Sequence, residues 1–466
     1  MAPDDGSSGQ MEMTTGTDGR FFFARLPAGS WALSAERRGF LGQKYGQRSL
    51  YNSGAISVVT GPGGVSEDLT FRLNPPAAIR GKVADENGEP VMGAFLQVLV
   101  QVPSTRMHFL VRKTVATDDI GEYRVPDLPA VTCYLLAVVP GSAGGSGFLP
   151  QYYSNVADPR AATPIQLKPG DEFAADFTLR RGRGVSVEIE GSSGIAGGGD
   201  SELLLLMMQG PRGSEVSAGT LGPGSGRTFY GVPPGRYKLM IADLRSTFIT
   251  SKWIDVGSDD LTVTLPFPNP PEVTAKLRVV NGDPSLLKNA VLRTYVSTDA
   301  NVIARPVRPD GTVVLPGMAA GRYSIALEGQ ELYIKSMTAR NAKVVDGLVD
   351  LPENGPVQLE IVAAGDGARV RGKVRAGSKP VSGVQVVLAP RRQSLNPEDY
   401  HAYQSDSDGT FDFRGIKPGD YVSFATSNAE LEYGNPAAIE KYLAAGKPVK
   451  AETNGSLELQ LEPLSR

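Results

Sequence analysis

The fold is decided by the stretch Asp408-Gly409-Thr410-Phe411-Asp412-Phe413-Arg414-Gly415-Ile416-Lys417-Pro418-Gly419-Asp420-Tyr421. Asp-Gly supplies the positive φ angle of a tight hairpin turn, and Phe411 and Phe413 then point to the same side of an extended strand. A second turn follows at Pro418 and Gly419, and Tyr421 lies two residues beyond it. The pattern predicts a turn, a half-buried strand, a second turn with Gly419 in the left-handed conformation, and another strand.

The same pattern occurs five times along the chain. The first copy runs from Thr17 to Trp31, and the others contain Gly121, Phe229, Gly311 and Gly409. The second-turn glycine of the other copies is Gly29, Gly235 or Gly321, whereas the second copy has Val131 there and Cys133 in the aromatic place. Cys133 therefore reads as a small core residue. Gly121 and Gly311 lie 190 residues apart across two copies, and Gly311 and Gly409 lie 98 apart, the scale of a Greek-key sandwich.

Two further strands are expected to bracket each copy. An opening strand is clearest at residues 79–83 and 370–374, which read Ile-Arg-Gly-Lys-Val and Val-Arg-Gly-Lys-Val. A closing strand with alternate apolar residues follows each copy, for example Leu457, Leu459 and Leu461. Such alternation indicates one buried and one wet face. The five closing strands contain Leu69, Phe71 and Leu73; Phe177 and Leu179; Leu261, Val263 and Leu265; Val357, Leu359 and Ile361; and Leu457, Leu459 and Leu461.

We therefore predict an all-β chain, a tandem array of Greek-key, immunoglobulin-like β-sandwiches, of which the first is incomplete at its N-terminus. The expected domains are 1–76 (truncated), 77–181, 182–268, 269–364 and 365–466. Proline-rich junctions such as Asn74-Pro75-Pro76 predict an extended rod with limited swivel. One helix is expected, Pro436 to Ala445, capped by Asn435 and ended by Gly446.

Composition excludes several classes of function. The chain has 466 residues, with 47 basic and 50 acidic ones and a net charge of −3, so it offers no field for nucleic acid or anionic lipid. Its longest apolar run, 203–208, is too short to insert into a membrane. The one cysteine excludes an internal disulfide.

The first copy has 16 residues before Thr17, too few for the opening strands of the other copies. We expect an absent N-terminal segment that holds these strands and a signal peptide. The alternative is a donor strand supplied in trans by a partner. The expected location is extracellular, at the cell surface or in the periplasm of a bacterium.

Residues 81–83, 88–91 and 93–94, with the Asp-Gly-x-Phe and Pro-Gly-x-Tyr turns, resemble the carboxypeptidase-regulatory-like, or prealbumin-like, domain. The second and fifth domains match best. The resemblance implies a scaffold without an activity of its own. Related B-type adhesin repeats carry a lysine for an isopeptide bond where this chain has Val83 and Val374, so no such crosslink is expected.

Candidate sites are few. Loop aromatics could stack on sugars: Tyr152, Tyr153, Tyr45, Tyr51, Trp253 and Tyr400, with Tyr403 beside Tyr400; the alternative is that they plug the open ends of the sandwiches. Asp406 and Asp408 are the first choice for a metal, although the hairpin alone explains Asp-Gly. His108 and His401 read as solvated loop residues. No catalytic group and no cofactor is expected.

The sequence thus predicts a non-enzymatic surface or secreted scaffold or adhesion protein that spaces or binds partners. The alternative is a carbohydrate-binding accessory protein that uses the loop aromatics. Its partners would be a glycan or a protein surface.

Overall fold

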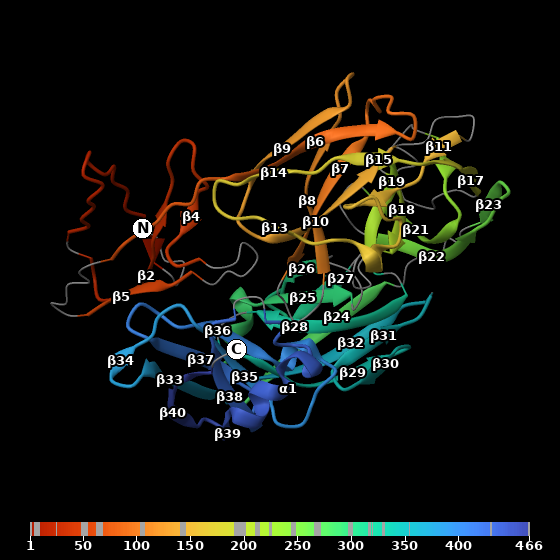
Figure 1. Ribbon diagram of the computed structural model, residues 1–466. Helices are drawn as coiled ribbons and strands as arrows, with labels where there is room; N and C mark the ends of the chain where they lie inside the picture. Colours follow the sequence, from red (N-terminus) through yellow and green to blue (C-terminus); the bar gives the residue numbers. More distant parts are fainter. Residues whose placement is uncertain are drawn as a thin grey trace.

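The computed structural model describes residues 2–3, 10–24, 26–47, 55–61, 69–102, 108–139, 146–190, 202–209, 215–222, 226–243, 248–264, 272–296, 302–315, 318, 320–328, 331–353, 355–428 and 431–464. Within these residues the chain is β-structure with one α-helix and short 3-10 turns (Figure 1). The prediction of an all-β array of sandwiches is confirmed.

The first unit contains short strands only: β1 (Ala2–Pro3), β2 (Gly29–Ala32), β3 (Ser34–Ala35), β4 (Gln43–Lys44) and β5 (Ser57–Thr60). The second contains β6 (Ala77–Asp85), β7 (Phe95–Val102), β8 (His108–Ala116), β9 (Glu122–Leu128), β10 (Thr132–Val138), β11 (Ser146–Phe148), β12 (Gln151–Tyr152), η1 (Pro159–Ala161), β13 (Ile165–Gln166), β14 (Glu172–Ala174) and β15 (Phe177–Leu179). The third contains β16 (Arg181–Arg183), β17 (Val185–Glu190), β18 (Glu202–Gln209), β19 (Glu215–Leu221), β20 (Thr228–Val232), β21 (Gly235–Asp243), β22 (Phe248–Val256) and β23 (Leu261–Thr264).

The fourth unit contains β24 (Val273–Val280), η4 (Pro284–Asn289), β25 (Val291–Val296), β26 (Val302–Pro306), β27 (Thr312–Leu315), β28 (Gly321–Glu328), β29 (Tyr333–Arg340), β30 (Lys343–Val345), β31 (Leu348–Leu351) and β32 (Val357–Ala364). The fifth contains β33 (Ala368–Ala376), β34 (Lys379–Pro380), β35 (Gln385–Pro390), η5 (Pro397–Asp399), β36 (His401–Gln404), β37 (Thr410–Ile416), β38 (Gly419–Thr426), α1 (Pro436–Ala445), β39 (Lys447–Ala451), β40 (Ser456–Leu461) and β41 (Pro463–Leu464).

Units two to five share one topology. In each, the opening strand lies between the strand that follows the first turn, which runs antiparallel to it, and the closing strand, which runs parallel to it. The opposite sheet has the equivalent order β12-β10-β7-β8, β22-β21-β18-β19, β31-β28-β25-β26 and β39-β38-β35-β36. Alternate apolar residues of the two sheets meet in a separate cluster in each unit.

Turn glycines behave as predicted at the first turn and only in part as predicted at the second. The Asp-Gly position has φ between 73° and 81° at Gly19, Gly121, Gly311 and Gly409. The positive φ predicted for the second-turn glycine is found at Gly29 and Gly321, at 156° and 147°, and is wrong for Gly235 and Gly419, which have no positive φ.

The aromatic residue two positions after this glycine bonds back across the second turn. A Cβ on Gly419 would lie 3.6 Å from the Tyr421 ring, and the Tyr421 hydroxyl donates a 2.8 Å hydrogen bond to the carbonyl of Lys417. Tyr237 bonds to the carbonyl four residues upstream in the same way at 3.0 Å, and Trp31 does so at 3.2 Å. In the first, third and fifth units the aromatic residue therefore ties the second turn to the start of the next strand.

The first unit departs from the predicted pattern. Neither residues 20–24 nor residues 69–73 form a strand, so the predicted closing strand at Leu69, Phe71 and Leu73 is wrong. In every other unit both corresponding segments pair with an opening strand. The described part of the first unit contains no opening strand. Its apolar residues still gather around Trp31, Leu33 and Val58.

The predicted helix is confirmed as α1. Asn435 accepts a hydrogen bond from the backbone N–H of Ala437, and the N–H of Gly446 bonds to the carbonyl of Leu443. Ile439 and Tyr442 are buried, and the Tyr442 ring stacks on Phe424 of β38 at 5.1 Å. The helix thus covers the outer face of the fifth unit's sheet.

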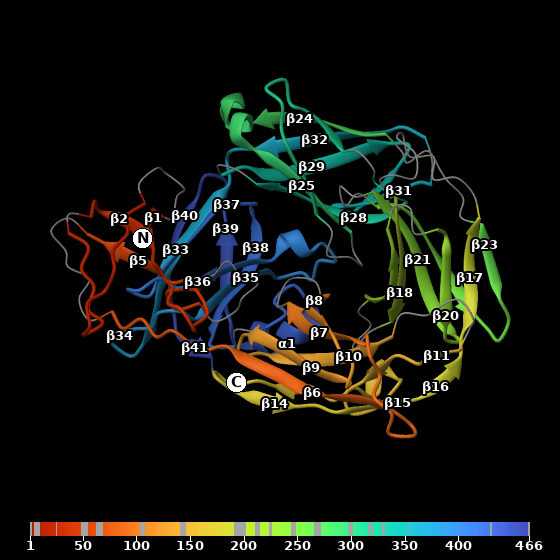
Figure 2. The same ribbon diagram turned by 90° about the horizontal axis from the view of Figure 1, so that it is seen from above.

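The predicted extended rod is wrong. The five units follow one another around a closed arrangement, in which the first unit lies beside the fifth (Figure 2). The first and fifth units are joined by hydrogen bonds between residues about 350 positions apart, such as the bond from Val59 to Ser407. Short proline-rich junctions restrict swivel, but the direction in which they turn the chain is set by the contacts described next.

Candidate functional site

The joint between the fourth and fifth units is built on one buried carboxylate. Asp366 lies between β32 and β33 and is 3% exposed. It accepts a hydrogen bond from the Tyr333 hydroxyl at 2.8 Å and another from the Asn281 side-chain amide at 2.6 Å. Burial alone would raise the pKa of Asp366, but these two donors hold it below its usual value. Asp366 therefore stays charged and fastens the three-residue link to the fourth unit.

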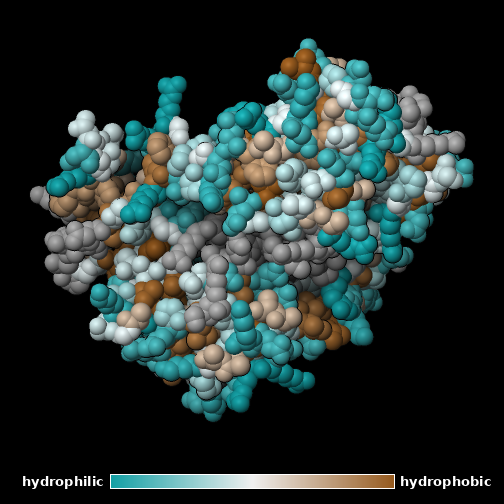
Figure 3. Space-filling view, viewed as in Figure 1, coloured by the Kyte–Doolittle hydropathy of each residue, from teal (hydrophilic) through white to brown (hydrophobic). Residues whose placement is uncertain are grey.

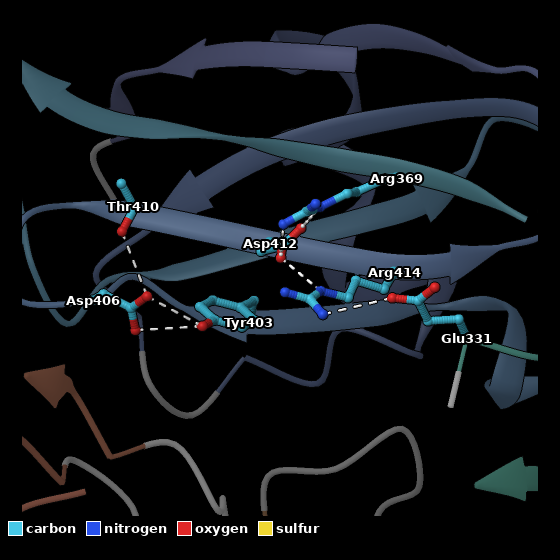
Figure 4. Close-up of polar contacts among 7 residues, drawn as sticks. All are labelled: Glu331, Arg369, Tyr403, Asp406, Thr410, Asp412 and Arg414. Atoms are coloured by element: carbon cyan, nitrogen blue, oxygen red, sulfur yellow. Dashed lines mark hydrogen bonds and ion pairs between the residues drawn. The ribbon is translucent and has the colours of Figure 1, made fainter. Parts of the chain in front are cut away.

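A second set of charges reinforces this joint (Figure 4). Arg369 of β33 forms a bidentate pair with Asp412 of β37, with N to O distances of 2.8 and 2.7 Å. Arg414 donates to the same carboxylate at 2.7 Å and reaches Glu331 of the fourth unit at 3.5 Å. The charge of Asp412 thus aligns Arg414, which carries the contact across the joint.

The first unit meets the fifth at the tip of the Asp406–Gly409 turn. The N–H of Ser407 donates to the carbonyl of Ser57 at 3.0 Å, and the Ser407 hydroxyl accepts from the N–H of Val59 at 3.2 Å. Gln404 donates to the carbonyl of Gly46 at 3.0 Å. Strand β5 of the first unit is thereby bonded through its backbone to the turn of the last unit.

An apolar contact lies beside these bonds. Ile56 is 7% exposed, and its side chain approaches Gly383 so closely that a Cβ there would lie 2.8 Å from its Cδ1 atom. Gly93 occupies the equivalent place in the second unit, with a similar φ, and a Cβ there would meet nothing within 4 Å. Of these two units, only the fifth has a side chain of another unit packed against this glycine.

The predicted metal ligands are engaged within the turn. Tyr403 donates to Asp406 at 3.2 Å, the N–H of Thr410 donates to Asp408 at 3.0 Å, and Lys373 lies 3.8 Å from Asp408 (Figure 4 shows the Asp406 side). In the described part of the chain no three His, Cys, Asp or Glu side chains are grouped as metal ligands would be. The geometry fits a hairpin turn that hydrogen-bonds to itself.

The loop aromatics do not form one platform. Tyr152 is fully buried and Tyr400 is 5% exposed. Tyr153 packs edge-on against Phe173 at 5.6 Å, and both rings lie against the second core. Tyr152 and Tyr400 lie in apolar clusters that are separate from the cores of their sandwiches.

The remaining predicted aromatics differ from one another. Tyr45 is half-buried against Phe71, with ring centroids 5.7 Å apart. Trp253 is 45% exposed on β22, with the Arg236 guanidinium 5.2 Å from its ring. Tyr51 lies outside the described residues. Of the described candidates, Trp253 is the one that presents a ring to solvent.

Neither cysteine nor histidine marks a reactive centre among the described side chains. Cys133 is buried in the second core, and burial raises the pKa of its thiol to about 12, as expected of a core residue. His401 is not a solvated loop residue: it lies half-buried on β36, and burial lowers its pKa to about 4. His108 begins β8, and its side chain lies outside the described residues.

The two positions that correspond to the crosslinking lysine of B-type adhesin repeats hold core residues. Val83 and Val374 are fully buried, whereas Lys82 is exposed. Where the chain is described, no helix is long and apolar enough to cross a bilayer.

Sequence reasoning missed the residues of both joints. Asp366 stands between Gly365 and Gly367, and a charged residue flanked by glycines in a three-residue link was the available signal. Ser407 and Gln404 gave none, because a polar turn tip and a polar strand end are expected anywhere.

No family model matches this chain, and no curated protein matches it. Among solved structures it is similar to the Bacillus anthracis TIE protein, at 11% identity over 82% of this chain and 72% of that one, with a TM-score of 0.17. It is also similar to the RrgB pilus protein of Streptococcus pneumoniae, at 9% identity over 84% of this chain and 98% of that one, with a TM-score of 0.16. A third similar structure is a 3-chlorocatechol 1,2-dioxygenase from Rhodococcus opacus, at 15% identity over 23% of this chain and 60% of that one, also with a TM-score of 0.16. Scores this low carry no argument about function, so the fold rests on the strands themselves.

Proposed function

We propose that the chain is a non-enzymatic scaffold of a surface or secreted protein that holds binding surfaces in a fixed arrangement. The observation that carries this proposal is that polar residues are committed to joints between units. Asp366 and Ser407 form hydrogen bonds with residues of neighbouring units, and Arg414 forms an ion pair with one. Such joints restrict motion between domains.

The proposal includes five separately folded units with the boundaries 1–76, 77–181, 182–268, 269–364 and 365–466, and a scaffold of carboxypeptidase-regulatory-like type. It also includes an extracellular, cell-surface or periplasmic location. The separate cores support independent units, because each cluster draws its residues from one of these ranges.

Small-angle X-ray scattering of the purified chain tests the fixed arrangement. The unaltered chain should scatter as a closed particle, and Gly383→Leu should open it by forcing a side chain against Ile56. Gly93→Leu is the matched control, because it imposes the same backbone strain where a Cβ meets nothing. A closed particle in the control and an extended one in Gly383→Leu is the expected outcome.

Two results would count against the scaffold. Scattering of the unaltered chain typical of a flexible string would show that the joints do not hold. An identical profile for Gly383→Leu and Gly93→Leu would show that the first unit is not fastened to the fifth at this place.

Carbohydrate binding remains the second candidate, and the exposed ring of Trp253 is the observation in its favour. A glycan array probed with the unaltered chain and with Trp253→Ala tests it, since stacking on a sugar needs an accessible aromatic face. Signals that disappear with Trp253→Ala would support this function, and an array at background would remove it.

A further inference from the structure

The joint between the fourth and fifth units contains an asparagine whose side-chain amide is bound to a buried carboxylate. Asn281 follows β24, and its amide nitrogen lies 2.6 Å from a carboxylate oxygen of Asp366. Asp366 is 3% exposed and also accepts from the Tyr333 hydroxyl at 2.8 Å. An amide can donate to such a carboxylate, whereas an ionised acid in the same place only accepts. The joint therefore requires residue 281 to remain an amide.

Packing fixes the residue that follows Asn281 as glycine. A Cβ on Gly282 would lie 2.9 Å from the Cα atom of Gly365, closer than real Cβ atoms approach. The N–H of Gly365 donates to the carbonyl of Val280 at 3.2 Å, which holds the two segments against each other. A larger residue after Asn281 is thus excluded where the first and last strands of the fourth unit end.

An asparagine followed by glycine is the amide most prone to lose ammonia. The backbone nitrogen of the glycine attacks the side-chain carbonyl carbon, the bond from that carbon to the amide nitrogen breaks, and the displaced proton leaves with the amide as ammonia. Water then opens the resulting succinimide ring to aspartate or isoaspartate. Glycine favours the reaction because it has no side chain to hinder the approach. Asn281 is exposed, so water reaches the ring, and Gly282 gives it no steric protection.

The bond to Asp366 supplies protection of another kind. Attack needs the amide carbon of Asn281 to turn toward the nitrogen of Gly282 and come within about 3–3.5 Å of it. A charge-assisted hydrogen bond that holds the amide nitrogen on Asp366 restricts this rotation. The backbone of Asn281 is held as well, in the left-handed region at a φ of 51°. The reaction at Asn281 is therefore slow until the joint opens.

Loss of ammonia would turn the attraction at this contact into repulsion. In place of the donor 2.6 Å from Asp366, the reaction leaves a second carboxylate. Two carboxylates that share one site repel each other, so that one of them must take up a proton or move away. Changing one partner of a buried charged contact in this way is strongly destabilising. A joint that has opened and reacted cannot close again in its former geometry.

We infer that Asn281 is a site of spontaneous deamidation that acts as a one-way latch on the joint between the fourth and fifth units. While the joint is closed, Asp366 holds the amide and Asn281 is preserved. Once the joint opens, the amide is lost as ammonia, and the new carboxylate keeps the joint open. The inference goes beyond the scaffold function, because it concerns how long the fixed arrangement lasts, whatever the scaffold binds.

Asn87 provides a reference for the rate within the same chain. It lies in the exposed turn after β6, and its backbone N–H donates to Asp85. Gly88 follows it, and a Cβ there would meet no described atom within 4 Å. Figure 3 shows hydrophilic side chains over much of the second unit, at the upper right of the view. The chain has two more Asn-Gly pairs, which begin at Asn354 and Asn454 and lie in other peptides.

Peptide mapping by mass spectrometry of the full chain, kept in mildly alkaline buffer, tests the protection. In the unaltered chain Asn281 should convert at least about tenfold more slowly than Asn87, because only open joints react. Asp366→Ala removes the acceptor and should bring the two rates within about threefold of each other. Asp310→Ala is the matched control, since this carboxylate bonds to Thr312 within the fourth unit and does not touch Asn281. Equal rates at Asn281 and Asn87 in the unaltered chain, or an Asn281 that stays slow in Asp366→Ala, would overturn the inference.

Asn281→Asp copies the product and tests the latch itself. The N–H of Asn454 donates to the carbonyl of Asp366 at 2.8 Å, so its hydrogen–deuterium exchange reports on the joint. This amide should exchange at least about tenfold faster in Asn281→Asp, and at nearly the unaltered rate in Asn281→Gln, which keeps an uncharged amide. Unaltered exchange in Asn281→Asp, or equal acceleration in both variants, would contradict the latch. Scattering of Gly383→Leu reads the contact of the first and fifth units, so either proposal can fail while the other stands.

Discussion

Replacing Gly372 by alanine should separate the opening and closing strands of the fifth unit. The new Cβ would lie 1.9 Å from the carbonyl oxygen of Leu459, where real Cβ atoms keep beyond 3.0 Å. The strands must then part by about 1 Å, an overpacking that costs about 1–3 kcal/mol, and weakened ladder bonds add about 1 kcal/mol. For a unit of this size, about 3 kcal/mol lowers the melting temperature by about 10–20 °C.

Differential scanning calorimetry of the full chain measures this shift, and hydrogen exchange over 368–464 assigns the transition to the fifth unit. Gly419→Ala is the control in the same unit, because its Cβ would meet the Tyr421 ring at an ordinary 3.6 Å. The control should cost less than about 1 kcal/mol. A Gly372→Ala melting temperature within about 2 °C of the control would refute the parallel pairing on which the topology rests.

Three other predictions follow from buried polar groups. Tyr421→Phe removes the hydroxyl that bonds to Lys417 and should destabilise the fifth unit by about 1 kcal/mol in calorimetry, while secondary structure by circular dichroism stays unchanged. The pKa of Asp366 is lower in the folded chain than in the unfolded one, so its contribution is present at neutral pH and is lost as pH falls below its unfolded value near 4. Between pH 5 and 3 (about one unit either side of that value), the melting temperature of the unaltered chain should therefore fall more than that of Asp366→Asn; parallel curves would contradict this. Cys133 should react with a thiol reagent only on unfolding, because it is buried and burial raises its pKa to about 12; rapid labelling of the native chain would contradict its core position.

The local structure was predictable because it depends on residues close in sequence. Asp-Gly before Phe411 and Phe413 gives a turn and an alternating strand at 410–416, whatever lies elsewhere. Asn435 and Gly446 bound the helix by hydrogen bonds within one turn of it. The positive φ of the second-turn glycine was predicted correctly at Gly29 and Gly321 and wrongly at Gly235 and Gly419, so the residue type alone does not decide its conformation.

The arrangement of the units was not predictable by the same means. Proline in the junctions limits flexibility, but the angle between units depends on contacts such as that of Asp366 with Tyr333 and Asn281, residues 33 and 85 positions away. The loop aromatics illustrate a related limit. A tyrosine after a loop can cover a core or face solvent, and only packing placed Tyr152 inside and Trp253 outside.

The fifth unit binds the first unit in this way, whereas the second unit, whose sequence resembles that of the fifth, does not. The difference lies in positions that the fold leaves unconstrained. The hydrogen bonds from Val384 to Ser405 and from Ala94 to Thr117 mark equivalent strand ends in the fifth and second units. Gln404, which donates to the first unit, corresponds to Ala116, which has no side-chain donor.

The tip of the turn shows the same freedom. Ser407 both donates its N–H and accepts through its hydroxyl, whereas Pro309, at the equivalent place in the fourth unit, has no N–H to donate. Asp119, in the second unit, would bring an unneutralised charge against strand β5. The hairpin itself needs only the glycine two residues later, so the tip can change from unit to unit without cost to the sandwich. A repeated fold can in this way carry one docking site on one copy, at positions where local sequence signals are weakest.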